Sequence, residues 1–351
     1  MSYLRKTQKR LISFLGLITI AIFGIMSTLG TGGGGGDDGG GVAPVTYTGL
    51  TTQAVITSDN ALLFGELAFL GLRAGSNITP LAVQSAPLTE TRNASVITIA
   101  RILHSVMTDI NINSALNSIP VGWVETQPPI PGDCGGTASG SIDVNESTRT
   151  FSGYFVFDKW CNYGITMDGT VDVSGTCDAS TFDPLTQTCD IIDYTMTFNT
   201  LNTSGYGVSE TMDGIVASVI TPTGYVSTVN LLLRDDNTNK TYQFENYVIT
   251  VTEDSPSFGY DTVAVTGNVY HPDYGFVVIS TPTPVQFYSD ALDSPPLSGV
   301  VLLTGEDGTV GPTTATFTFT DFDNYTLEVD TNGDGIPDVI LNCTWSTDIC
   351  A

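Results

Sequence analysis

The stretch that decides the fold runs from Asp190 to Phe287 and includes Tyr194-Thr-Met-Thr-Phe198, Val229-Asn-Leu-Leu-Leu233 and Tyr247-Val-Ile-Thr-Val251. It holds six runs of alternating apolar and polar residues, joined by short clusters of Gly, Pro, Asn and Asp. This alternation indicates antiparallel strands with one buried face. The stretch therefore predicts a sheet built from neighbouring strands.

The parity of each run predicts which side chains face the core. The expected inward residues are Phe151, Phe155, Phe157, Ile165, Met167, Val171, Val173, Tyr194, Met196, Phe198, Ile215, Ala217, Val219, Val229, Leu231, Leu233, Val263, Val265 and Val269. Between Tyr242 and Thr252 the parity changes, which predicts a β-bulge near Glu245-Asn246. A turn is expected at His271-Pro-Asp-Tyr-Gly275.

Further runs occur at 300–303, 315–319 and 325–329, so the sequence predicts roughly a dozen strands with short connections. Short connections favour pairing between sequence neighbours. We expect a mainly β protein, an antiparallel meander that forms a curved sheet or a barrel-like sandwich. A small two-helix region precedes it.

The N-terminal segments resemble export and anchoring elements. Residues 1–30 combine a basic start with an apolar run from Leu11 to Leu29, which predicts a signal peptide or an N-terminal membrane anchor. Residues 31–44 form a Gly-rich flexible tether. Because Thr31 offers no thiol, no lipidation is expected, and either an uncleaved membrane helix or ordinary cleavage takes its place.

Residues 45–125 are expected to form a helical support region. Ser58-Asp59-Asn60 is a plausible N-cap for a helix from Ala61 to Arg73, ended by Gly71 or Gly75. Apolar residues at helical spacing predict a second helix between Val96 and Ile110. The pair supports the sheet or, alternatively, binds a partner. Residues 126–133 are expected as a Pro-rich linker and 134–351 as the antiparallel β domain.

The charge balance excludes one class of partner. The chain holds 11 basic and 37 acidic residues, and four of the basic residues precede Thr31. A surface this acidic repels phosphate backbones and anionic lipid, so we expect no nucleic-acid binding and membrane contact only through the N-terminal segment. The acidic coat either keeps the protein soluble or attracts a cationic partner.

Six cysteines in an exported chain indicate disulfides: Cys134, Cys161, Cys177, Cys189, Cys343 and Cys350. Sequence alone leaves about 15 pairings open. Proximity favours Cys177–Cys189 and Cys343–Cys350, which leaves Cys134–Cys161. A metal site would need closer Cys or His spacing than the chain offers.

The stretch from Lys240 to Pro284, with Glu245-Asn-Tyr-Val-Ile-Thr-Val251 and Asn268-Val-Tyr-His-Pro-Asp-Tyr-Gly275, resembles uncharacterised envelope lipoproteins of Gram-negative bacteria, as does the Gly-rich tether. Those proteins carry a lipidated Cys where this chain has Thr31. The resemblance implies export and a place in the cell envelope, either the periplasm or the cell surface. It implies no activity.

One short motif points to a metal. The loop Asp330-Thr-Asn332-Gly-Asp334-Gly-Ile336-Pro-Asp338 resembles the calcium loops of dockerins and thrombospondin type 3 repeats. Calcium prefers six to eight oxygen ligands, which Asp330, Asn332, Asp334, Asp338 and the Ile336 carbonyl would supply. A further acid is expected where Leu341 stands, so any site is weak. The alternative is an Asx-rich turn.

No catalytic or cofactor-binding constellation is evident. The sequence therefore favours an exported, envelope-associated protein with a structural or binding role, whose partner is an envelope protein or a polysaccharide. The alternative is a secreted carbohydrate-active enzyme that uses paired carboxylates.

Overall fold

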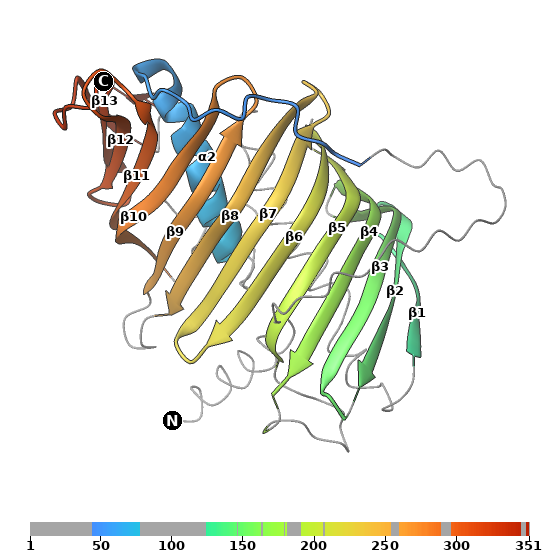
Figure 1. The fold of residues 1–351 in the computed structure, drawn as a ribbon. Helices are drawn as coiled ribbons and strands as arrows, with labels where there is room; N and C mark the ends of the chain where they lie inside the picture. The colour runs from blue at the N-terminus through green and yellow to red at the C-terminus, as the bar shows by residue number, and fades with distance from the viewer. Residues whose placement is uncertain are drawn as a thin grey trace.

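The computed structural model describes residues 44–77, 124–145, 147–162, 164–178, 180, 191–205, 208–253, 260–288, 296–344 and 349–350. Its strands form one antiparallel sheet in which each strand pairs only with its neighbours in sequence (Figure 1). The order is β1 to β15 without a crossover, and β1 and β15 are not paired with each other. The predicted antiparallel meander is confirmed. The described sheet is open, so the expected barrel-like sandwich is wrong.

The strands are long, and most carry an alternating burial pattern. Their bounds are β1 Val124–Pro131, β2 Gly135–Asn145, β3 Thr150–Asn162, β4 Ile165–Cys177, β5 Ile191–Gly205, β6 Val208–Thr221, β7 Gly224–Asp235, β8 Lys240–Glu253, β9 Tyr260–His271, β10 Gly275–Tyr288, β11 Ser298–Asp307, β12 Pro312–Phe319, β13 Asn324–Asp330, β14 Val339–Thr344 and β15 Ile349–Cys350.

The core lies on one face of this sheet, which we call the inner face. Nearly all residues expected to point inward are buried there, for example Phe157, Met167 and Phe198. The expectation for β6 is wrong: Ile215 and Val219 are 44% and 49% exposed. Val216 instead lies opposite Met196 of β5 and takes the inward position. The run 215–219 is apolar at almost every residue, so its parity is set by pairing.

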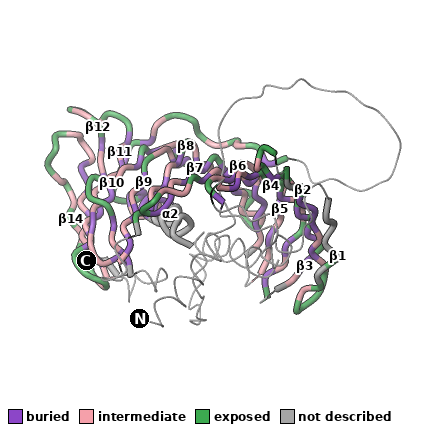
Figure 2. Tube along the Cα trace, turned by 90° about the horizontal axis from the view of Figure 1, so that it is seen from below, coloured by how far each residue is buried: buried purple, intermediate pink, exposed green. Residues whose placement is uncertain are grey.

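The sheet curves into an arch, which Figure 2 shows end-on. The predicted bulge at Glu245-Asn246 is confirmed, because β8 gains a residue against β7 there and Asn246 adopts φ 48°. Gly267 lies beside it on β9, where a Cβ would approach the Asn246 carbonyl oxygen to 2.6 Å. Such bulges increase the local twist of a strand. They contribute to the curvature of the arch.

One helix, α2 (Ser58–Asn77), packs against the inner face over β8 and β9. It begins three residues before the expected Ala61. The carbonyl of Thr57 accepts from the Ala61 amide, and the Asn60 side chain accepts from the Thr57 amide, so Asn60 acts as the reciprocal cap. Phe64 is fully buried in the core, and Gly65 leaves room for the Phe317 ring, which a Cβ would approach to 2.1 Å.

Residues 44–57, which we call the strap, cross the upper ends of the strands before α2 begins (Figure 1). The Val45 amide donates to Asp213 of β6, the Ala54 amide to Phe276 of β10, and the Ile56 amide to the Thr313 hydroxyl of β12. Val45 and Ile56 are buried. The strap therefore joins strands that are far apart along the chain.

Several expectations for the first half of the chain need correction or stay untested. The stretch 126–131, expected within a Pro-rich linker, belongs to strand β1 and pairs with β2. Its prolines suit an edge strand, since one side needs no amide donors. The apolar segment 11–29, the tether and the second helix at 96–110 lie outside the described residues. Among the described helices, none combines the length and the hydropathy needed to cross a membrane. The domain boundaries stay predictions.

Candidate functional site

The loop expected to bind calcium closes on its own hydrogen bonds. Asp330 is buried, and its carboxylate accepts the amides of Asn332, Gly333 and Gly335 at 3.2, 2.7 and 2.7 Å. The Asp334 carboxylate accepts the Ile336 amide at 2.8 Å. These contacts form an Asx-rich turn between β13 and β14.

Asp338 completes the loop from the other side. It accepts the Thr331 hydroxyl at 2.6 Å and the Asn332 side-chain amide at 3.2 Å. Hydrogen bonds to Thr331 hold the pKa of the Asp338 carboxyl below its usual range. No three acidic residues of this loop bring their oxygens together within the described part of the chain. As placed, Asp330, Asn332, Asp334, Ile336 and Asp338 do not form a clear cation site.

The disulfide expectation is confirmed at one pair. Cys134, just before β2, is bonded to Cys161 of β3. Cys177 and Cys343 are also disulfide-bonded. Cys343 lies opposite Cys350 in the β14–β15 ladder, as the expected pairing requires. Cys189 lies outside the described residues. The pairs Cys177–Cys189 and Cys343–Cys350 stay predictions.

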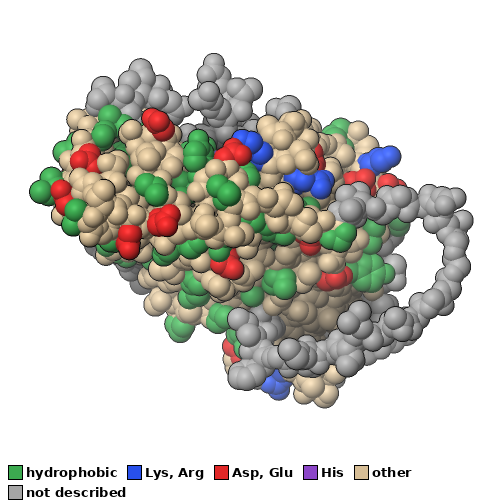
Figure 3. Space-filling model, turned by 45° about the horizontal axis from the view of Figure 1, so that its top comes forward, with side chains coloured by type: hydrophobic (Ala, Val, Ile, Leu, Met, Phe, Trp, Pro, Cys, Tyr) green, Lys and Arg blue, Asp and Glu red, His purple; other side chains and the backbone are tan. Residues whose placement is uncertain are grey.

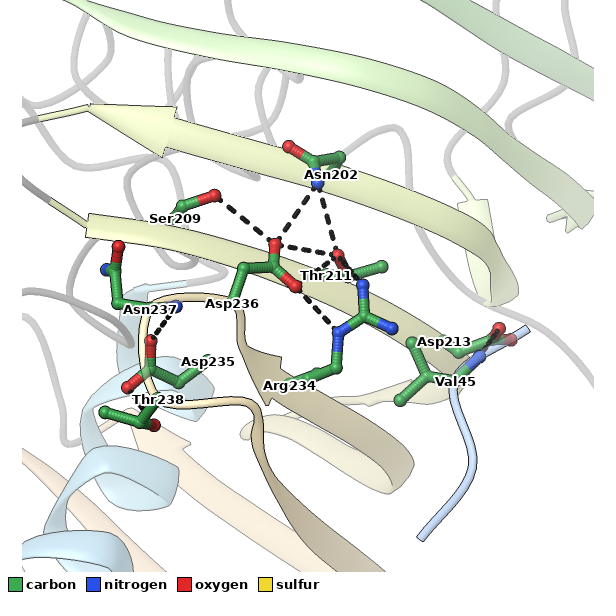
Figure 4. Close-up of polar contacts among 10 residues, drawn as sticks. All are labelled: Val45, Asn202, Ser209, Thr211, Asp213, Arg234, Asp235, Asp236, Asn237 and Thr238. Atoms are coloured by element: carbon green, nitrogen blue, oxygen red, sulfur yellow. Dashed lines mark hydrogen bonds and ion pairs between the residues drawn. The ribbon is translucent and has the colours of Figure 1, made fainter. Parts of the chain in front are cut away.

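A polar network on the outer face ties three strands together (Figure 4). Asp236, at the β7–β8 turn, accepts from Arg234 at 2.7 Å, and from Thr211 of β6 at 2.9 Å. Asn202 of β5 donates to the same carboxylate at 3.3 Å. A partly exposed ion pair contributes little by itself, but Thr211 is fully buried and extends it into a network. The network engages Arg234 with Asp236, so Arg234 is not available to the nearby carboxyl of Glu210.

Glu210 belongs to β6 and lies on the inner face directly below this network. It is 1% exposed, and neither carboxylate oxygen has a hydrogen-bond partner. Its ladder neighbour on β5 is Thr203, also 1% exposed, whose hydroxyl likewise has no partner. Burial, and then the negative charges of Asp235 and Asp236, raise the pKa of the Glu210 carboxyl to about 8. Both side chains share the face of Met212 and Leu201.

Sequence reasoning missed Glu210 and Thr203. An inward Glu would have been visible from strand parity, but the apolar run 215–219 indicated the opposite parity for β6 and placed Glu210 outside. Neither residue belongs to a motif. Only the pairing with β5 assigns both to the inner face.

His271, expected as a turn residue, ends β9 and is buried beside α2. Its ring meets Tyr242 at 5.3 Å and Phe64 at 6.2 Å between centroids. Its Nδ1 accepts the Asp273 amide at 3.2 Å. Burial lowers the pKa of His271 to about 4. Lys240 and Asp273 form an ion pair at the nearby rim. These contacts fit a packing role for His271.

The outer face of the sheet carries aligned rows of small and hydroxyl side chains. One row crosses seven strands, from β3 to β9: Ser152, Ser174, Thr195, Ala217, Thr228, Val248 and Thr266. A parallel row begins at Tyr154, which is 45% exposed, and includes the exposed Ile215. In the oblique view of Figure 3, uncharged groups predominate, with acidic side chains and a few Lys and Arg side chains among them. The described side chains thus present an extended, largely uncharged surface.

Comparison with protein-family models, with curated sequences and with solved structures found no match to this chain.

Proposed function

We propose that the protein is an exported, cell-envelope-associated β protein whose role is binding. Export is supported by the basic and apolar N-terminal segment and by the disulfides, which persist in oxidising compartments. The acidic composition argues against nucleic acid and against electrostatic docking on anionic lipid.

The observation that carries the binding role is the outer face. Its rows of Ser, Thr and Val side chains are partly or fully exposed over many strands, whereas α2 packs on the inner face. An exposed face with apolar side chains among hydroxyl groups suits a partner that offers both hydrogen bonds and carbon surface. A neutral envelope polysaccharide has this chemistry, and it avoids the repulsion that an anionic polymer would meet.

Cosedimentation of the purified protein with insoluble envelope polysaccharide tests this proposal. Thr228→Lys places a long side chain in the middle of the seven-strand row and is expected to reduce retention. Thr318→Lys makes the same change on the outer face of β12, outside that row, and is expected to leave retention unchanged. Equal effects of the two variants, or no retention of the unmodified protein, would remove the outer face as the binding surface.

The same incubation separates binding from catalysis. Release of soluble sugar that is lost on a single Asp or Glu substitution would favour the carbohydrate-active enzyme instead. Glu210 has the raised pKa of a general acid, but at 1% exposure it does not contact solvent in this conformation.

A further inference from the structure

Glu210 and Thr203 together have three buried side-chain oxygens without a hydrogen-bond partner, and all three are acceptors once Glu210 is ionised. The two residues are ladder neighbours, which places their Cβ atoms about 5 Å apart on the same face. Each is 99% removed from solvent, and the two carboxylate oxygens and the hydroxyl oxygen all lack a partner. Buried polar groups are normally satisfied, so three orphaned oxygens at one place call for a donor.

The electrostatics of the surroundings favour a cation. Asp235 lies opposite Glu210 on β7, and Asp236 follows it. Arg234 lies beside Asp235 on β7, and Lys240 lies opposite Asp235 on β8. However, Arg234 is paired with Asp236, and Lys240 is paired with Asp273. On the next strand, β8, burial raises the pKa of Tyr242, and the negative charges of Asp235 and Glu210 raise it further. Among the described residues, Glu210 thus lies in negative potential without a positive partner.

The geometry also limits which cation fits. A divalent metal needs about six oxygen ligands or more, and Glu210 and Thr203 supply three. Asp235 is held in the β7–β8 turn, where its two oxygens accept from the Asn237 amide and the Thr238 hydroxyl at 2.9 and 2.6 Å, and its side chain makes no hydrogen bond to the side chain of Glu210 or Thr203. A primary ammonium offers three N–H donors and no acceptor, which matches three acceptors.

The neighbours of the pair determine what the ammonium is attached to. Met212 and Leu201 lie one inward position further along β6 and β5, and both are fully buried. Met167 lies opposite Thr203 on β4. Thr203 and Glu210 are two residues from the ends of their strands, so this position is near the rim of the sheet. An alkyl chain suits such apolar surroundings, and because Glu210 and Thr203 are each 1% exposed it can enter only when this rim of the sheet opens.

We propose that Glu210 and Thr203 form a binding site on the inner face for a primary alkylammonium group, either of a small amine or of a lysine side chain. The ammonium donates to the Glu210 carboxylate and the Thr203 hydroxyl, and its alkyl chain packs on Met212 and Leu201. Binding releases the proton that Glu210 carries in the free protein. This site lies on the opposite face from the proposed polysaccharide surface and does not depend on it.

Calorimetric titration of the full chain with hexylamine at pH 8 tests the site. Saturable binding is expected, with net proton release measured from the heats in two buffers of different ionisation enthalpy. Hexanol, which lacks the charge, and tetramethylammonium, which lacks N–H donors, are expected to bind at least about tenfold more weakly. Titration with lysine amide acetylated at its α-amine distinguishes a lysine side chain from a free alkylamine as the natural source.

Two variants and a control assign the effect to this pair. Glu210→Gln and Thr203→Val are each expected to weaken hexylamine binding at least about tenfold. Asp172→Asn removes one exposed carboxylate on the outer face of β4 and is expected to change nothing. No saturable binding by the unmodified protein, unchanged binding in Glu210→Gln, or an equal loss in Asp172→Asn would overturn the proposal. Retention on polysaccharide is expected to be the same in Glu210→Gln, which keeps the two proposals separate.

Discussion

Replacing Glu210 by Gln is predicted to stabilise the protein, by an amount that grows with pH. Gln keeps the shape of the side chain but cannot ionise. The carboxyl titrates near its ordinary pKa of 4.5 in the unfolded chain, whereas burial and the nearby aspartates raise its pKa to about 8 in the folded protein. Above pH 4.5 the unfolded state is therefore favoured by ionisation, and folding stability falls as pH rises toward 8.

The size of the effect follows from the difference between the pKa of Glu210 in the unfolded chain and in the folded protein. Each pKa unit corresponds to about 1.4 kcal/mol, so the raised pKa costs about 3 kcal/mol of folding free energy at pH 7 and roughly 4 to 5 kcal/mol at pH 8. At pH 4 both states are protonated and the cost vanishes. The Gln variant and the unmodified protein are thus expected to have similar stability at pH 4 and to diverge steadily above it.

Urea unfolding of both proteins at four values between pH 4 and pH 8.5, without added amine, measures this difference. Glu245→Gln is the matched control. The Glu245 carboxylate accepts hydrogen bonds from Tyr270 and Asn268 on the outer face, so this variant should be less stable than the unmodified protein at neutral pH. A stability difference between Glu210→Gln and the unmodified protein that does not change with pH would refute the reasoning. It would mean that Glu210 is solvated or paired in solution.

Four further predictions concern other parts of the chain. Asp330→Ala should destabilise by about 1–3 kcal/mol in thermal or urea unfolding, because three amides lose a buried acceptor, whereas Asp334→Ala should have a smaller effect. If the same loop binds calcium, as the motif suggests, calcium should raise the melting temperature more than magnesium does at equal ionic strength. The double substitution Asp330→Ala and Asp334→Ala should abolish that difference. Equal shifts with the two ions would show that the loop is only a hydrogen-bonded turn. Gly65→Ala should cost about 1–3 kcal/mol despite the better helix propensity of Ala, since the new methyl group meets Phe317, and an unchanged melting temperature would contradict that packing. Peptide mapping under non-reducing conditions should find Cys177 joined to Cys189, and any other partner for Cys177 would exclude the proximity argument.

Local sequence pattern predicted most of the fold because a meander depends on local information. Each strand pairs with the next, so the alternation within a run and the turn after it determine both the strand and its neighbour. The bulge at Glu245-Asn246 was predictable for the same reason, since the parity change is visible within one strand. The disulfide Cys134–Cys161 joins residues near one another in the β2–β3 hairpin.

The sequence was less informative where a strand is apolar on both faces. Along β6, residues 215–219 include apolar side chains at both odd and even positions, so the sequence does not show which of them face the core. Only the register with β5 decides it. The error moved every β6 side chain to the wrong face, Glu210 included. The strap was also beyond local reasoning, because its partners are as distant as Thr313.

The strap has a consequence for the order in which the molecule assembles. Every strand can pair as soon as its successor emerges, because all ladder contacts are local, and local contacts form quickly. The strap differs, because the Ile56 amide donates to the hydroxyl of Thr313, which follows it by 257 residues. In a chain made from its N-terminus, Val45 can bond Asp213 once β6 is present and Ala54 can bond Phe276 once β10 is present, whereas Ile56 lacks its partner until β12 has been synthesised. The bond between Ile56 and Thr313 thus forms only after most of the sheet is present, and a chain truncated before β12 would lack it.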